Sequence, residues 1–301
     1  MVVGRFAPSP SGRMHLGNVF SGLISWLSVR SQGGKMVLRI EDLDPDRSKQ
    51  CHIDALRQDL AWLGLDWDEE MPLQSGRASV YETYFHKLPV YPCYCTRNEL
   101  HSASAPHGSD GNLLYAGTCR YLTRGERAAK TRKPAWRVEV PDVEITFTDG
   151  IYGPVTQRLQ DACGDFILRR ADGVYAYQLA VVCDDALGGV TLVVRGRDLL
   201  DSTPRQIWLY ETLGFSVPDF SHVPLLVAPD GRRLSKREAD LDLEHLRQSY
   251  SAEEIIGILA HSCGLTPKAE ALRPEDLIRE FSWDKIQKQD ISILDYLSRD
   301  V

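Results

Sequence analysis

The densest group of side chains able to do chemistry lies close to the start of the chain. Six donors or acceptors crowd the stretch after a short apolar run: Arg5, Ser9, Ser11, Arg13, His15 and Asn18. Pro8, Pro10 and Gly12 exclude regular structure there, and apolar residues at helical spacing begin at Val19. The pattern predicts a strand, an irregular loop and a helix whose first turn can bind a phosphate or carboxylate. An ordinary strand-to-helix turn is the alternative.

Charged residues also follow two predicted buried strands, where α/β sheets bind their ligands. Glu41 comes after the apolar strand at 36–40, and its carboxylate suits an α-amino group. Arg195 ends the β-branched strand at 190–194, and its guanidinium can hold a carboxylate through two parallel hydrogen bonds. A loop or N-cap carboxylate is the alternative for Glu41, and a surface ion pair is the alternative for Arg195.

A third candidate element is a basic loop. Residues 232–237 read Arg-Arg-Leu-Ser-Lys-Arg, directly after a Pro-Asp-Gly turn at 229–231. Mobile cations beside a hydroxyl suit the triphosphate of ATP, because they can follow the charge that grows as pyrophosphate leaves. By itself a short basic loop is a weak signal, and its position relative to the His15 element is what makes it informative.

Three of the seven cysteines are spaced as metal ligands. Cys93 and Cys95 are followed, after a polar stretch, by Cys119. Zinc prefers four thiolate, imidazole or oxygen ligands in a tetrahedron, so one ligand is missing from this set. His101 and His107 are chemically suitable. A metal-free insertion with buried thiols is the alternative.

The overall composition indicates an ordinary globular protein. The chain has 301 residues and a net charge of −7, with no apolar stretch of transmembrane length and no secretory pattern at its N-terminus. We therefore expect a cytoplasmic protein with no membrane partner. The negative charge argues only weakly against nucleic acid, because residues 119–137 concentrate basic side chains. These are Arg120, Arg124, Arg127, Lys130, Arg132, Lys133 and Arg137. A solvated charged face is the alternative.

Several of these elements together resemble the class I glutamyl- and glutaminyl-tRNA synthetases. Residues 5–12 and 15–18 are similar to their first signature and its His-Ile-Gly-His element, with Leu16 for Ile and Asn18 for the last His. Residues 38–44, 177–185 and 195–198 resemble further family segments. Residues 232–237 resemble the Lys-Met-Ser-Lys-Ser loop, in which Lys236 is the retained lysine.

The resemblance implies a role for each matching residue. Glutamate would be held by Arg5, Ala7, Ser9, Glu41, Tyr177 and Arg195. ATP, with Mg2+, would be bound by His15, Gly17, Asn18, Ser235 and Lys236. His15 and Lys236 would be the catalytic pair that stabilises the charge on the phosphates. Without the resemblance, core packing would be the expectation for Tyr177.

The fourth zinc ligand is also suggested by resemblance. Zinc-containing glutamyl-tRNA synthetases place a His shortly after the third Cys, where this chain has Arg120 and Tyr121. A shorter branch of the family, the glutamyl-Q tRNA(Asp) synthetases, uses a Tyr four residues before that Cys, which corresponds to Tyr115. The resemblance implies one structural Zn2+ held by Cys93, Cys95, Tyr115 and Cys119.

The implied fold is α/β: a Rossmann-type class I aminoacyl-tRNA synthetase catalytic domain with a zinc-binding insertion and a short helical C-terminal part. The expected division is 1–88 and 151–240 for the two catalytic halves, 89–150 for the insertion and 241–301 for the helical part. From the residues themselves, we predict further strands at 138–148, 165–170 and 222–227. Helices are predicted to end at Gly64 and to start near Thr203, Ser251 and Arg273.

The implied activity is formation of glutamyl-adenylate followed by glutamyl transfer to tRNA. We expect no anticodon-binding domain, which favours the shorter branch and glutamylation of queuosine in the anticodon loop of tRNA(Asp). One alternative is a minimal glutamyl-tRNA synthetase that charges the 3′ end of tRNA(Glu), and another is a tRNA-binding remnant without activity. The expected partners are ATP, L-glutamate and queuosine-bearing tRNA(Asp), and we expect a monomer.

Overall fold

The computed structural model describes residues 1–96, 114–232 and 241–297. Its main sheet contains seven strands: β1 (Val3–Phe6), β2 (Lys35–Leu38), β3 (Glu69–Glu70), β6 (Glu144–Asp149), β7 (Gly153–Arg158), β9 (Leu192–Gly196) and β10 (Asp219–Val223). Their order is β3-β2-β1-β9-β10-β6-β7, parallel from β3 to β6 and antiparallel between β6 and β7. Strands far apart in the sequence therefore pair in the centre of the sheet, at β1 and β9.

Two smaller sheets complete the strands of the described residues. One is antiparallel and contains β4 (Val90–Cys93), β5 (Ala135–Val138) and β8 (Ile167–Arg169), in that order. The other pairs β11 (Leu226–Val227) with β12 (Ile291–Ser292) in parallel. Strands from before and after residue 150, where the insertion was expected to end, therefore share sheets. β8 follows residue 150 and pairs with β5 in the small sheet, whereas β6 precedes it and pairs with β7 and β10 in the main sheet.

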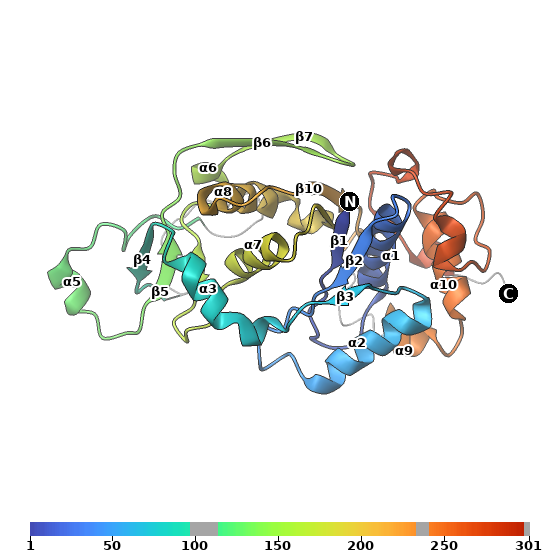
Figure 1. Cartoon of the computed structure of the whole chain (residues 1–301), viewed down its shortest axis with the longest axis horizontal. Helices are drawn as coiled ribbons and strands as arrows, with labels where there is room; N and C mark the ends of the chain where they lie inside the picture. The colour runs from blue at the N-terminus through green and yellow to red at the C-terminus, as the bar shows by residue number, and fades with distance from the viewer. Residues whose placement is uncertain (97–113, 233–240, 298–301) are drawn as a thin grey trace.

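Helices cover the main sheet and extend from its ends. They are α1 (Leu16–Arg30), α2 (Gln50–Leu63), α3 (Ala78–Phe85), α5 (Arg124–Ala128), α6 (Leu159–Ala162), α7 (Tyr177–Leu187), α8 (Thr203–Leu213), α9 (Leu243–Leu246), α10 (Ala252–Ser262) and α11 (Leu294–Leu297). Short 3-10 helices are η1 (Gln74–Arg77), η2 (Arg197–Ser202), η4 (Pro274–Leu277) and η5 (Trp283–Lys285). Figure 1 shows the small sheet with α5 at one end of the long axis and α9 with α10 at the other.

Helix α1 is the central helix of the larger core. Its apolar residues at spacings of three and four are buried, as the sequence pattern predicts, and so is most of the rest of its surface. Close packing against β1 depends on Gly4, because a Cβ there would lie 2.2 Å from Val29 Cγ2. A second core surrounds α7 and α8, and a small third cluster contains the three cysteines at 93, 95 and 119. The helix ends predicted at Gly64 and Ser251 are confirmed, the first by a left-handed C-cap and the second by a capping box.

Three predicted elements are wrong in their extent. The strand predicted at 138–148 is two strands in different sheets, because Pro141 offers no N–H to continue β5. The strand predicted at 222–227 breaks in the same way at Pro224, between β10 and β11. The helix predicted from Arg273 is only the 3-10 turn η4.

Candidate active site and metal centre

The carboxyl ends of the central strands bring three arginines together inside the protein. Arg5 lies on β1, Arg39 directly follows β2, and Arg195 lies on β9. They are 4%, 0% and 6% exposed. Parallel neighbours end at one edge of the sheet, which is why residues 34 to 190 positions apart share this site. Burying three guanidinium groups is costly unless anions or hydrogen-bond acceptors surround them.

Two of the three arginines share the carboxylate of Asp185 on α7. Arg39 Nη1 donates to Asp185 Oδ1, and Arg5 Nε lies 3.4 Å from the same oxygen. Arg39 Nη2 also lies 3.0 Å from Glu41 Oε1. Burial opposes ionisation of Asp185, but Arg39 and Arg5 outweigh it and hold its pKa below the ordinary value. At Glu41 burial dominates over Arg39, and its pKa is raised.

Arg195 has a different environment, made of uncharged acceptors. Its Nε lies 3.0 Å from His222 Nε2, and its Nη1 lies 2.8 Å from Gln206 Oε1. Its Nη2 donates to Thr203 Oγ1 at 2.8 Å and to the carbonyl of Leu199 at 3.3 Å. Among the described residues, no carboxylate lies within 4.0 Å of this guanidinium, and one N–H on Nη1 remains without a protein partner. Burial, with the like charge of Arg5, lowers the pKa of Arg195.

This environment changes the expectation of two parallel hydrogen bonds from Arg195 to a carboxylate. Four of its five N–H groups already donate to His222, Gln206, Thr203 and Leu199. One N–H group remains, so Arg195 in this arrangement can donate one hydrogen bond to a carboxylate and not two. Gln206 in turn donates to Gln178 Oε1 at 2.7 Å, next to Tyr177 in sequence. The acceptors of Arg195 come from β10, η2 and α8, and His222, 27 positions away, is the most distant of them in sequence.

Sequence analysis missed the carboxylate that holds His222. His222 Nδ1 lies 2.6 Å from Asp149 Oδ2, and both side chains have no exposed area. Burial is the main cause that lowers the pKa of His222 to about 4, despite the opposing effect of Asp149. The imidazole is therefore neutral at neutral pH. The only sign of these residues in the sequence was their position near the ends of predicted strands. Their pairing depends on β6 lying next to β10 in the sheet.

The other expected glutamate-site residues lie around this cluster. Tyr177 begins α7 and is half-buried, and burial raises its pKa, with Glu41 as the next cause. Ala7 is half-buried and Ser9 exposed in the irregular loop after β1. The carbonyl of Pro8, between them, accepts a hydrogen bond from Glu41 N at 3.0 Å. The loop after β1 and the loop after β2 thus run side by side.

The first-motif histidine is at the start of α1. His15 is its N-cap residue, and Nδ1 accepts from Gly17 N at 3.2 Å. The side chain is exposed, and Gly17 and Asn18 in the first turn are half-buried. His15 also forms an isolated β-bridge with Asp242, and Leu243 N donates to Met14 O at 3.0 Å. Ser235 and Lys236 lie outside the described residues.

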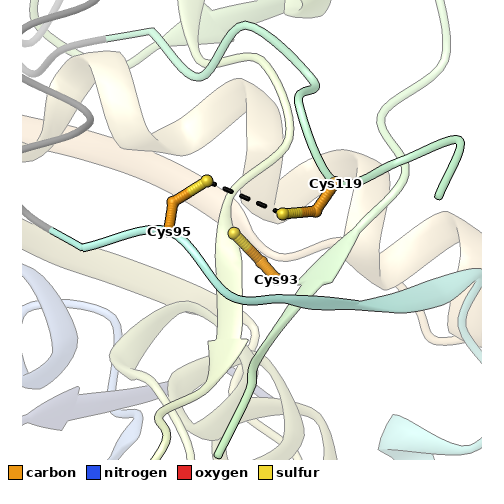
Figure 2. A group of neighbouring side chains, drawn as sticks. All are labelled: Cys93, Cys95 and Cys119. Carbon is orange, nitrogen blue, oxygen red and sulfur yellow. Dashed lines mark hydrogen bonds between the residues drawn. The ribbon is translucent and has the colours of Figure 1, made fainter. Parts of the chain in front are cut away.

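The three expected cysteine ligands form one cluster. The Sγ atoms of Cys93, Cys95 and Cys119 all lie within 4.8 Å of one another, and Figure 2 shows them pointing inward from two segments. Tyr115 Oη lies 3.5 Å from Cys93 Sγ and 3.9 Å from Cys95 Sγ. Three sulfurs and one oxygen at such distances fit a tetrahedral divalent metal. His101 and His107 lie outside the described residues.

A buried cation supports this cluster. Arg137 Nε lies 3.3 Å from Cys93 Sγ, and its guanidinium lies over the Tyr115 ring at 3.9 Å from the centroid. Burial opposes ionisation of Cys93, but Tyr115 and Arg137 outweigh it, and its pKa is lowered. Burial and the neighbouring Cys93 raise the pKa of Cys95 to about 12. Thiolates held around a metal would leave negative charge that Arg137 is placed to offset.

The basic cluster at 119–137 has fewer exposed cationic side chains than its sequence suggests. Arg137 is buried, and Arg120 forms ion pairs with Glu139 and Asp165. The exposed basic side chains of this stretch are Arg124, Lys130, Arg132 and Lys133.

In the described parts of the chain, no helix combines the length and apolar character that crossing a membrane requires.

Comparison with known proteins identifies the family. The model of the family described as "tRNA synthetases class I (E and Q), catalytic domain" matches residues 1–295. The chain belongs to the class I tRNA synthetases (E and Q). The α/β class I catalytic fold and the ligase-type aminoacyl-transfer chemistry expected from the motifs are thereby confirmed.

Relatives of this class I synthetase differ in how much of their length they share with it. A protein of Symbiobacterium thermophilum named glutamyl-Q tRNA(Asp) synthetase is 49% identical, with 97% of this chain and 96% of that protein covered. One of the same name from Neisseria meningitidis is 41% identical, with 97% and 99% covered. The glutamate-tRNA synthetase of Elizabethkingia anophelis, whose crystal structure is known, is 28% identical and superposes with a TM-score of 0.82. The match covers 96% of this chain and 67% of that synthetase. The resemblance to the shorter branch is confirmed.

Proposed function

We propose that this chain activates L-glutamate with ATP and transfers the glutamyl group to queuosine in the anticodon loop of tRNA(Asp). Support for the acceptor comes from relatives named glutamyl-Q tRNA(Asp) synthetase, which match over nearly their whole length. Support for the amino acid comes from one observation on the site. Arg195 is a buried cation whose direct partners are all uncharged.

A buried guanidinium without a carboxylate partner is a strong site for an anion, because little water remains to solvate its charge. The α-carboxylate of glutamate must stay free to react with ATP, so we assign Arg195 to the side-chain carboxylate. We assign Glu41 to the α-ammonium group, whose charge would favour the ionised form of this buried carboxyl. Arg5, Ala7, Ser9 and Tyr177 complete the proposed site.

The proposed reaction has two steps. An α-carboxylate oxygen of glutamate attacks the α-phosphorus of ATP, the bond to the bridging oxygen breaks, and pyrophosphate leaves with that electron pair. A hydroxyl of queuosine then attacks the carbonyl carbon of the adenylate, loses its proton and releases AMP. Neither step needs a covalent enzyme intermediate, so positioning and electrostatic stabilisation supply the catalysis.

The ATP part of the site is assigned to the first and third motifs. We propose that His15, Gly17 and Asn18 at the start of α1 bind the nucleotide, with Mg2+ accompanying the phosphates. We assign Ser235 and Lys236 of the third motif to the triphosphate as well. The exposure of His15 and its place at a helix N-terminus support this assignment.

The cysteine cluster is assigned to zinc. We propose that Cys93, Cys95, Cys119 and Tyr115 hold one Zn2+ that stabilises the loop between β4 and β5. The inward-facing sulfurs and the nearby phenol oxygen support this donor set. The proposed ion would be held beside the small sheet, where Cys93 ends β4, so its proposed role is structural.

Labelled glutamate tests the proposed acceptor. The chain is incubated with ATP, labelled glutamate and total tRNA from cells that make queuosine or do not. We expect label in tRNA(Asp) only from queuosine-producing cells, and loss of that acceptance after periodate treatment of the tRNA. Equal labelling of tRNA(Glu) would instead support a minimal glutamyl-tRNA synthetase, and absence of glutamate-dependent pyrophosphate exchange would contradict enzymatic activity.

A further inference from the structure

A line of buried polar groups leads from Arg195 into the sheet. His222 on β10 lies between Asp149, at the end of β6, and Arg195, on β9. The imidazole has no exposed area, and its two nitrogens lie 2.6 Å from Asp149 Oδ2 and 3.0 Å from Arg195 Nε. None of the sequence motifs contains Asp149 or His222, and neither carries a role in the proposed reaction.

The chemistry of the partners determines where the imidazole carries its hydrogen. Arg195 Nε can only donate, so His222 Nε2 must be the bare, accepting nitrogen. The one ring hydrogen is then on Nδ1 and is donated to Asp149. Thr203 Oγ1 accepts from Arg195 Nη2 and donates to the carbonyl of Leu199 at 3.4 Å, and it also lies 3.1 Å from Nε2.

We propose that His222, kept in the Nδ1–H form by Asp149, is a positioning residue that orients the Arg195 guanidinium toward the glutamate carboxylate without neutralising it. The inference rests on the proposed function, in which Arg195 binds glutamate. An aspartate or glutamate at position 222 would also orient the guanidinium, but its charge would compete with the substrate. A neutral imidazole fixed by Asp149 still orients the guanidinium of Arg195. The negative charge of Asp149 stays separated from the guanidinium by the width of the imidazole ring.

The surroundings of Asp149 make an isosteric test possible. Its Oδ1 accepts from Ile151 N at 3.0 Å, Tyr152 N at 2.9 Å and His222 N at 3.3 Å. In D149N the amide oxygen therefore keeps this position, and the amide NH2 faces His222 Nδ1. Since NH2 donates, the ring hydrogen moves to Nε2, where it meets the N–H of Arg195. The side-chain volume hardly changes.

The experiment combines ring NMR with substrate kinetics on the full chain. The 15N shifts of His222 report which nitrogen carries hydrogen, and glutamate-dependent ATP–pyrophosphate exchange in the presence of tRNA reports KM and kcat. We expect Nδ1–H in the wild type and Nε2–H in D149N. The glutamate KM of D149N should rise about tenfold or more, with the ATP KM and kcat changed by less than about threefold.

Variants at position 222 separate positioning from packing. H222Q can donate to Asp149 through its amide and accept from Arg195 through its oxygen, so we expect its glutamate KM within about threefold of wild type. H222L offers neither bond and should match D149N. H261Q is the matched control, because His261 lies in α10 with its Nδ1 3.0 Å from the carbonyl oxygen of Thr266 and has no part in the proposed site. H261Q should leave both KM values unchanged.

Three outcomes would overturn the inference: wild-type hydrogen on Nε2, a shifted tautomer in D149N with unchanged glutamate KM, or equal glutamate KM in H222Q and H222L. If D149N fails to fold, the comparison of H222Q with H222L still decides. A wild-type chain without glutamate-dependent exchange would instead contradict the proposed function. The ring NMR distinguishes the two failures, because it requires no activity.

Discussion

The backbone of His15 pairs with that of Asp242 in an isolated antiparallel bridge. A hydrogen bond of 3.0 Å from Leu243 N to Met14 O extends the contact. Asp242 lies six positions after Lys236 in the sequence. The segment that follows the basic loop is therefore joined to the start of α1, where the first motif lies.

Weakening that connection should affect ATP more than glutamate. Asp242 Oδ1 caps α9 by accepting from His245 N at 2.9 Å, so D242A should lower the free energy of unfolding by about 1 kcal/mol. We expect the ATP KM to rise severalfold while the glutamate KM stays unchanged. The control is S251A, which removes the corresponding cap of α10 and should cost similar stability. Equal changes of the ATP KM in both variants would contradict the proposed link.

Replacing Arg195 by lysine tests the amino-acid site. R195K keeps the positive charge but cannot hold His222, Gln206 and Thr203 at fixed angles while binding substrate. We expect the glutamate KM to rise at least about tenfold, with the ATP KM nearly unchanged, in the pyrophosphate-exchange assay. R197K is the control: Arg197 forms a partly exposed ion pair with Asp290, and its replacement should change neither KM. A glutamate KM in R195K equal to that of wild type would remove the basis for the assignment.

The buried histidine predicts a dependence of stability on pH. The pKa of His222 is about 4 in the folded chain, against an ordinary value of about 6.5. Between these values the unfolded chain binds a proton that the folded chain excludes. The free energy of unfolding should therefore fall as the pH drops from about 6.5 to about 4, by on the order of 3 kcal/mol.

Urea unfolding at several pH values measures this effect. H222Q has no imidazole at this position, so its loss of stability over the same pH range should be smaller by most of that amount. Parallel pH profiles for the wild type and H222Q would show that another group controls the transition. Asp149 does not reverse the sign, because its lowered pKa contributes stability that is lost only at still lower pH.

Metal analysis tests the cysteine cluster. We expect about one zinc per chain in freshly purified protein, little zinc and a lower melting temperature in C93S, and no change in C51S, which alters an exposed thiol. Y115F keeps the ring under Arg137 but loses the oxygen, so it should release zinc to a chelator about tenfold faster or more. A zinc content near zero in the wild type would rule out the proposed site, and retention in Y115F would exclude the phenol as a ligand.

Local patterns were enough for the elements that local chemistry controls. The spacing of apolar residues predicted α1, the glycine at 64 predicted the end of α2, and the capping box at Ser251 predicted the start of α10. The same patterns failed at Pro141 and Pro224, where strands that look continuous separate into different sheets. Which sheet a strand joins depends on partners elsewhere in the chain, and no local pattern carries that information.

The sequence by itself determined the family motifs, the cysteine spacing and the placement of Arg195 at the end of a buried strand. These depend on residue type and on neighbours within a few positions. Only the tertiary structure decided that Arg195 contacts His222 while Arg39 contacts Asp185. Arg195 is therefore left without a carboxylate partner, whereas the charge of Arg39 is balanced by a carboxylate. The physical reason is that side chains 27 and 146 positions apart become neighbours only when strand order and helix packing bring them to the same edge of the sheet.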